Sequence, residues 1–216
     1  RRQRQMCIRD RLKTHETVNA RGTFAPLSAM ELSQIDANRA HLEEVGLQAI
    51  REGKVAAVLL AGGQGTRLGF DKPKGMYNIG VTRELYIFEC LINNVMEIVK
   101  KAGAWIPFYI MTSDKNYDDT TAFLKEKNYF GYNAKYIHFF KQEMAPSVDY
   151  NGKLLMEAPD RLSLSPNGNG GWFSSLCRYG YDKQMKEAGV EWLTAFAVDN
   201  LSLIHISEPT RLQLIS

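Results

Sequence analysis

The sequence has 216 residues, of which 44% are hydrophobic and 24% are charged, and its 27 basic and 24 acidic residues give a formal net charge of +3. A chain of about this length can bury a good core as one domain. No apolar run reaches the roughly 18 residues that a membrane span needs, so no membrane partner is expected.

Both ends of the sequence differ from ordinary protein termini. Residues 6–10 (MCIRD) and 201–206 (LSLIHI) can be encoded by one DNA string and its reverse complement, so an inverted DNA element flanks the reading frame. We therefore expect residues 1–11 and 201–216 to be tails derived from sequencing adapters. The genuine protein is then expected within residues 12–200, and its catalytic domain is expected to be incomplete.

The tails also account for the excess positive charge. They contain six arginines and two acidic residues, and without them 21 basic and 22 acidic residues remain. A nearly neutral chain has no long-range attraction for nucleic acid, so no nucleic-acid partner is expected. Cys90 and Cys177 lack the paired spacing of a zinc or redox site. With no signal peptide before residue 12, a cytoplasmic location is expected, and the oligomeric state is left open.

The first predicted elements are a helix and a buried strand. Residues 27–52 carry a ragged helical stripe of apolar side chains, with Ser28 or Ser33 able to cap its start and Gly53 after its end. Residues 55–61 (VAAVLLA) are a continuous apolar run of strand length. Such a run is typical of a parallel strand that is covered on both faces.

The rest of the chain alternates predicted helices and strands. Helices are expected over residues 85–102, 114–125 (capped by Asp114) and 172–188, and strands over residues 106–111, 136–140 and 192–198. Residues 142–171 are less regular, with a turn at Asn151-Gly152. This alternation predicts an α/β fold with an open, mostly parallel sheet and ligands at the carboxyl ends of its strands. Residues 12–53 are then an N-terminal helical segment, and residues 54–200 are the sheet-bearing domain.

A glycine-rich loop follows the first strand, within residues 60–77 (LAGGQGTRLGFDKPKGMY). Gly62, Gly63 and Gly65 have no side chains to keep phosphate oxygens away from the backbone N–H groups. The spacing fits neither the dinucleotide fingerprint G-x-G-x-x-G nor the P-loop pattern. The loop is therefore interpreted as a phosphate-binding loop of another kind.

Three cations lie in or just after the glycines. Arg67, Lys72 and Lys74 supply charges suited to a polyphosphate, and Pro73 stiffens the approach to Lys74. For a glycine string alone, a plain turn flanked by solvated lysines is the favoured alternative. The length of the string and its flanking sequence argue for the phosphate-binding interpretation.

The strings AGGQGTRLG and PKGMYNIG of this loop resemble the signature of the UDP-N-acetylhexosamine pyrophosphorylases, within the UTP-sugar-1-phosphate uridylyltransferase family. Five further strings follow in the order that the family has them: PFYIMTS, YFG, FFKQEM, PNGNGG and VDN. The related UDP-glucose pyrophosphorylases lack the GGQGTRLG wording. The resemblance covers nearly all of residues 55–200 and implies a Rossmann-like nucleotidyltransferase fold of the glycosyltransferase-A type, with a mostly parallel sheet flanked by helices.

The reaction implied by the resemblance is uridylyl transfer. UTP and N-acetylhexosamine-1-phosphate would give UDP-N-acetylhexosamine and pyrophosphate, with Mg²⁺ as the cofactor. The alternatives are an inactive nucleotide-binding fragment or degenerate homologue, and a UDP-sugar pyrophosphorylase of different sugar specificity. A nicotinamide dehydrogenase is disfavoured by the spacing of the glycines and by Arg67.

The resemblance also implies the site residues. Arg67 and Lys74 would be catalytic, with Arg67 meeting the outgoing pyrophosphate and Lys74 holding the reacting phosphate. Asp199, at the carboxyl end of a strand, would bind magnesium or the ribose. The nucleotide would be bound by Leu60, Gly62, Gly63, Gly65, Thr66, Gln142, Gly168, Asn169 and Gly170.

Gln142 falls where the family reads the uracil edge. A Gln amide offers both the donor and the acceptor that an imide edge requires. Its neighbours Lys141 and Glu143 depart from the family pattern, in which uncharged residues are common at these positions. Taken singly, Gln142 is equally well an ordinary polar residue at a strand end, and Asp199 a turn cap.

Overall fold

The computed structural model describes residues 25–26 and 28–199, with only the backbone of Arg67. Both predicted tails lie outside the described residues. The chain divides into two compact units, residues 1–38 and 39–216, which are considered separately below. No helix in the described part of the chain is both long and apolar enough to cross a lipid bilayer.

The helix predicted over residues 27–52 is wrong as a single element. The structure has α2 (Leu32–Ala37) in the first unit and α3 (Arg39–Arg51) in the second, separated at Asn38. Neither predicted serine caps α2, because the helix begins after Glu31, whose backbone N–H donates to Gln34 Oε1 at 2.9 Å. The Asn38 side chain donates to Gln34 O at 2.8 Å, and this competition with the backbone favours a helix end.

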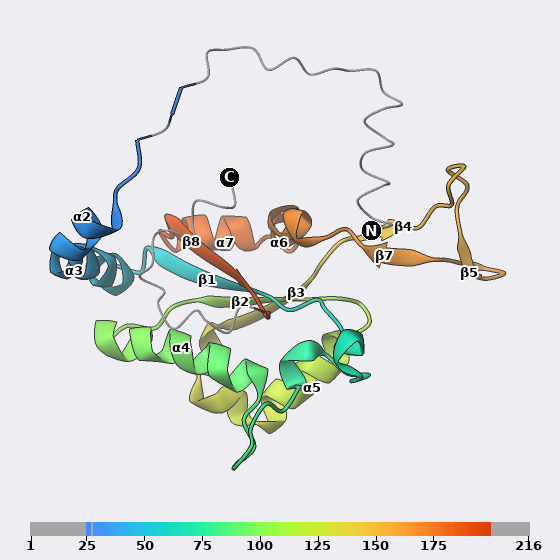
Figure 1. The fold of residues 1–216 in the computed structure, drawn as a ribbon, viewed down its shortest axis with the longest axis horizontal. Coiled ribbons are helices and arrows are strands. Elements are labelled where there is room, and N and C mark those ends of the chain that lie inside the picture. The colour runs from blue at the N-terminus through green and yellow to red at the C-terminus, as the bar shows by residue number, and fades with distance from the viewer. Residues whose placement is uncertain (1–24, 27, 200–216) are drawn as a thin grey trace. The chain divides into compact units, whose positions relative to one another are not determined.

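A four-stranded parallel sheet forms the centre of the second unit, as predicted. Its strands are β1 (Val55–Leu60), β2 (Phe108–Thr112), β3 (Ile137–Lys141) and β8 (Trp192–Ala197), in the order β3-β2-β1-β8. Each lies within two residues of its predicted bounds. Helices α4 (Ile87–Ala102) and α5 (Tyr117–Glu126) cover one face, and α6 (Trp172–Arg178) and α7 (Tyr181–Glu187) cover the other (Figure 1).

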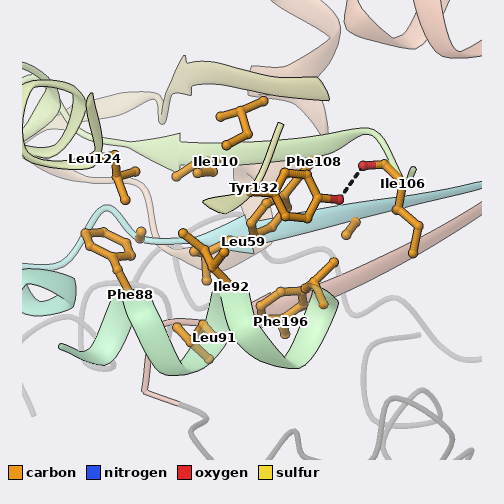
Figure 2. Packing of buried hydrophobic residues seen from close by; sticks show 14 of the residues in the cluster. Leu59, Phe88, Leu91, Ile92, Ile106, Phe108, Ile110, Leu124, Tyr132 and Phe196 are labelled. Atoms are coloured by element: carbon orange, nitrogen blue, oxygen red, sulfur yellow. Dashed lines mark hydrogen bonds between the residues drawn. The ribbon is translucent and has the colours of Figure 1, made fainter. Parts of the chain in front are cut away.

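The two faces of the sheet bury separate cores, because side chains alternate along a strand. Leu59 of β1 and Phe108 of β2 pack with Phe88 of α4 in the larger core, shown in Figure 2. Val58 and Tyr109, one position along, face the second core. Burial on both faces explains why these strands appear in the sequence as continuous apolar runs.

Two other predicted helices differ from the structure. The helix expected over residues 172–188 is broken into α6 and α7 at Gly180, which has φ +74° and therefore stops a right-handed helix. Helix α5 begins after Asn116 and not after Asp114. The carboxylate of Asp114 instead pairs with Lys141, with 3.1 Å between Oδ1 and Nζ.

The segment between β3 and α6 contains more structure than predicted. It forms two small antiparallel pairs, β4 (Met144–Pro146) with β7 (Leu164–Pro166) and β5 (Met156–Ala158) with β6 (Arg161–Leu162). The turn at Asn151-Gly152 is confirmed, with Gly152 at φ +83°. Figure 1 shows this arm, in orange, extending away from the sheet.

The strand order creates a switch point between β1 and β8. From β1 the chain proceeds through β2 to β3 on one side, whereas β8 pairs with the other side of β1. Because all four strands are parallel, their carboxyl ends lie on the same side of the sheet. Open α/β sheets bind ligands beyond these carboxyl ends, beside such a switch point.

His138 of β3 gives the fold a pH dependence. Its ring stacks on Tyr109 with 4.8 Å between centroids and lies 5.5 Å from the ring of Tyr181. Burial lowers the pKa of His138 below its ordinary value of 6.5. As the pH falls, His138 is therefore protonated in the unfolded chain before it is protonated in the folded chain. The contribution of the neutral, buried His138 to the stability of the fold is complete above pH 6.5 and is lost as the pH falls through the lower folded pKa.

We therefore expect the free energy of unfolding, measured with urea, to decrease between about pH 6.5 and pH 5. His138→Phe retains an aromatic ring without the titrating group and should remove part of this decrease. His41→Gln, at an exposed position of α3, is the matched control and should leave the decrease unchanged. An equal decrease in His138→Phe and in the unsubstituted chain would contradict the assignment.

Candidate functional site

A cavity of about 340 Å³ lies at the carboxyl ends of β1 and β8. Ten of the predicted site residues line it. They are Leu60, Gly62, Gly63, Gly65, Thr66, Lys74, Gln142, Gly168, Asn169 and Asp199. The fold therefore brings together residues that are as much as 139 positions apart in the sequence, from Leu60 to Asp199.

The glycine loop folds back on itself beside this cavity. It contains two short 3-10 turns, η1 (Thr66–Leu68) and η2 (Lys74–Met76). The N–H of Gly65 donates to Lys72 O at 3.0 Å, and the N–H of Lys74 donates to Gly63 O at 3.3 Å. Because α4 begins only at Ile87, the loop does not lead directly into a helix N-terminus as a dinucleotide fingerprint does.

The three loop glycines serve different purposes. A Cβ on Gly62 would lie 2.7 Å from Cδ of Gln142, so glycine is required for the Gln142 amide to approach this closely. A Cβ on Gly65 would lie 2.9 Å from Phe70 O, within the closed loop. Gly63 alone has open space around the position of a Cβ. Close packing thus gives a second reason for glycine at positions 62 and 65, in addition to the predicted access for phosphate.

The backbone amides of Gly62 and Gly63 are uncommitted in the described structure. Within the described residues, nothing accepts a hydrogen bond from the backbone N–H of Gly62 or Gly63. Both glycines line the cavity. Successive free N–H groups of this kind form an anion-binding concavity.

Gln142 is the inward-facing residue of its segment. It is 8% exposed, its backbone N–H donates to Thr112 O at 2.8 Å, and its Nε2 lies 3.5 Å from Gly62 O. The charged neighbours form ion pairs elsewhere. Lys141 pairs with Asp114 at 3.1 Å, and Glu143 pairs with Arg178 at 2.8 Å. The departure of Lys141 and Glu143 from the family pattern therefore leaves the Gln142 amide in the cavity.

Of the predicted cations, Lys74 is the one that the structure brings to the cavity. Its ammonium group contacts the Asp199 carboxylate, and the two side chains are 27% and 64% exposed. Lys72 is exposed and is not among the lining residues, so the prediction that it contributes to phosphate affinity is not supported by its position. The side chain of Arg67 lies outside the described part of the structure.

Only some residues of the string PNGNGG line the cavity. Pro166, Gly168 and Asn169 line the cavity, and Gly168 has φ +85°, which favours glycine. Gly170 does not line the cavity, although it was predicted to bind the nucleotide. It lies within a 3-10 turn, Asn169–Gly171, that leads directly into α6.

Several lining residues were not predicted. These are Gln64, Leu68, Pro166, Ala197 and Val198. Ala197 and Val198 directly precede Asp199 at the end of a predicted strand, so their position beside the site was available from the sequence. Leu68 carried no comparable signal.

Asp199 is the candidate ligand for magnesium. In the described part of the chain, no three His, Cys, Asp or Glu side chains are grouped so as to hold a metal ion. Mg²⁺ is commonly bound by one or two carboxylates together with substrate phosphates and waters. One exposed carboxylate at the cavity fits that mode of binding, although Lys74 now pairs with it.

A glycine-rich loop, a lysine and a buried amide meet at the switch point of an open parallel sheet, which defines an α/β domain with a candidate phosphate-binding site. The chain belongs to the UTP–glucose-1-phosphate uridylyltransferase family, whose model matches residues 9–208. This finding confirms the family to which the loop and its flanking strings pointed.

Similar proteins carry names from the N-acetylhexosamine branch. The chain is 35% identical over 192 residues to a probable UDP-N-acetylglucosamine pyrophosphorylase of Schizosaccharomyces pombe, covering 85% of this chain and 40% of that protein. It is 40% identical over 169 residues to the UDP-N-acetylglucosamine pyrophosphorylase of Saccharomyces cerevisiae, covering 76% and 35%. The chain thus spans well under half the length of these relatives.

Solved structures agree on the fold. The crystal structure of a putative UDP-N-acetylglucosamine pyrophosphorylase from Entamoeba histolytica matches with a TM-score of 0.75 and 33% identity, over 83% of this chain and 46% of that one. A UDP-glucose pyrophosphorylase from Leishmania major, at 18% identity and a TM-score of 0.60, shows the shared fold alone. The predicted nucleotidyltransferase fold is confirmed.

Proposed function

We propose that this chain supplies the UTP-binding part of an active site that transfers a uridylyl group to N-acetylhexosamine-1-phosphate. The products are UDP-N-acetylhexosamine and pyrophosphate. The loop wording GGQGTRLG and the names of the relatives support the N-acetylhexosamine branch. The complete reaction belongs to a protein of the relatives' length, of which this chain spans about 40% at most in these two comparisons.

One observation carries the proposal: two uncommitted amide N–H groups, a lysine and a buried Gln amide line a single cavity. The N–H groups of Gly62 and Gly63 and the ammonium group of Lys74 suit phosphate oxygens. The Gln142 amide suits the donor and acceptor of a uracil edge. Phosphate and base recognition within one cavity is what UTP requires.

The chemistry needs alignment and charge neutralisation more than proton transfer. An oxygen of the sugar phosphate, already anionic, bonds to the α-phosphorus of UTP, and the bridging oxygen leaves with pyrophosphate. No general base is required for this step. Lys74 holds the reacting phosphate and Arg67 meets the outgoing pyrophosphate, which are the roles that preorganised cations have in phosphoryl transfer.

Two further groups complete the proposed site. Asn169, which lines the cavity, borders the cleft between nucleotide and sugar phosphate. Asp199 would hold magnesium, which when bound neutralises phosphate charge. On substrate binding, the contact between Asp199 and Lys74 would break, and each group would contact the substrate complex instead.

A chimera with a full-length relative tests whether residues of this chain support the reaction. Residues 55–199 are placed in the Saccharomyces cerevisiae relative instead of its matching segment, and pyrophosphate release is measured with UTP and several sugar-1-phosphates. We expect release with N-acetylhexosamine phosphates and none in the Lys74→Ala chimera. A folded chimera that binds UTP but releases no pyrophosphate would instead favour a nucleotide-binding module without activity.

A further inference from the structure

Asn116 lies between β2 and α5, behind the glycine loop. It is the N-cap residue of α5 and is 0% exposed. A fully buried polar side chain nearly always forms hydrogen bonds with other groups of the protein. The partners of Asn116 therefore indicate its purpose.

The two ends of the Asn116 amide connect separate segments. Its Oδ1 accepts a hydrogen bond from the backbone N–H of Ser113 at 2.6 Å, which attaches it to the end of β2. Its Nδ2 donates to Ala61 O at 3.0 Å and lies 3.5 Å from Gly63 O. One buried side chain thus spans from β2 to the glycine loop, across more than 50 residues of sequence.

These contacts hold the carbonyl side of the loop. Gly63 O also accepts from the backbone N–H of Lys74 at 3.3 Å, and Gly62 O lies 3.5 Å from Gln142 Nε2. Each of three successive carbonyl oxygens, from Ala61 to Gly63, therefore has a protein donor nearby. The N–H groups of Gly62 and Gly63 are meanwhile uncommitted within the described residues.

The contrast between bonded carbonyl oxygens and unbonded N–H groups affects how strongly the loop can bind an anion. A carbonyl oxygen carries partial negative charge and repels phosphate, whereas an N–H group attracts it. A peptide that rotates exchanges one for the other. Fixing the carbonyls from behind keeps the N–H groups available without reorganisation when the ligand arrives.

We propose that Asn116 is a positioning residue for the phosphate-binding loop, fixing its carbonyls so that the amides of Gly62 and Gly63 serve the triphosphate. The inference rests on the proposed function, because it assumes that UTP occupies this cavity. It assigns Asn116 no contact with the nucleotide. Its effect is therefore on phosphate affinity and not on base recognition.

The test compares UTP with uridine, which shares the base but has no phosphates. Asn116→Asp retains the acceptor for Ser113 N–H but removes the donor to Ala61 and Gly63, and Asn116→Ala removes both. Loss of such a buried hydrogen bond is expected to weaken UTP binding about tenfold or more. Uridine affinity, measured by NMR titration, should change by less than about twofold.

Thr112→Val is the matched control. Thr112 is also 0% exposed, and its Oγ1 donates to Phe140 O at 3.0 Å, away from the glycine loop. This variant should leave the ratio of UTP to uridine affinity unchanged. Thermal unfolding of all variants shows which of them are folded.

The outcomes separate the two proposals. Absence of UTP binding by the unsubstituted chain overturns the proposed function, and this inference with it. Normal UTP binding by both folded Asn116 variants, or equal weakening of UTP and uridine, overturns the positioning role alone. Failure of both variants to fold where Thr112→Val folds also overturns it, since Asn116 would then serve the fold and not the loop.

Discussion

Replacing Lys74 with alanine is expected to weaken UTP binding by about 10- to 100-fold, or roughly 1.5–3 kcal/mol, which is the range for losing a hydrogen bond to a charged group. Lys74 is 27% exposed at the cavity and contacts Asp199. Alanine removes the cation and also leaves the Asp199 carboxylate unpaired beside the phosphates. Both changes oppose binding of a polyanion, and titration calorimetry measures the sum.

Lys72→Ala provides the matched control for this substitution. It removes the same charge two residues earlier, from an exposed side chain that does not line the cavity. A change of less than about threefold is expected, as for a solvated charge. The double variant Lys74→Ala/Asp199→Asn should regain part of the lost affinity in the absence of magnesium. Equal losses in Lys72→Ala and Lys74→Ala would contradict the assignment of Lys74.

The second large effect is expected for Gly62→Ala. The added Cβ would lie 2.7 Å from Cδ of Gln142, so the buried amide must move. The displaced atoms are the end of a flexible side chain, so the expected cost in stability is small, about 1 kcal/mol. Displacement of Gln142 should also weaken UTP binding about tenfold or more, because a base-reading group loses its alignment. The expected signature is a reduced preference for UTP over CTP.

Gly63→Ala distinguishes this packing effect from a general sensitivity of the loop. Nothing lies within 4 Å of the position of its Cβ in the described structure. Its free energy of unfolding should stay within about 0.5 kcal/mol of the unsubstituted chain. Unfolding curves in urea and paired UTP and CTP titrations measure both quantities. Unchanged stability and base preference in Gly62→Ala would show that Gln142 does not depend on this glycine.

The sheet could be predicted from sequence because its strands are buried on both faces. VAAVLL of β1 and FYIMT of β2 are apolar throughout, and their lengths and spacing agree with the structure. The interruptions of helices were harder to predict from the sequence. The break at Gly180 occurs at a glycine in an otherwise periodic segment, and the break at Asn38 occurs where a side-chain hydrogen bond is made to the helix backbone. Neither competes visibly with helical periodicity in the sequence.

The candidate site was predictable where its residues are adjacent in sequence or follow a strand. Gly62, Gly63 and Lys74 share one loop, and Asp199 follows β8. Asn116 was missed because its loop partners lie 53 and 55 positions earlier, and only the fold brings them together. The orientation of Gln142 relative to its charged neighbours also required the structure. The roles of Arg67 and of magnesium stay predictions.

A calorimetric titration of this chain with UTP tests the central claim most directly. We expect saturable binding at one site, competition by pyrophosphate, weaker binding of CTP and no binding of NAD. A folded chain that shows no saturable UTP binding, or that binds NAD more tightly than UTP, would contradict it.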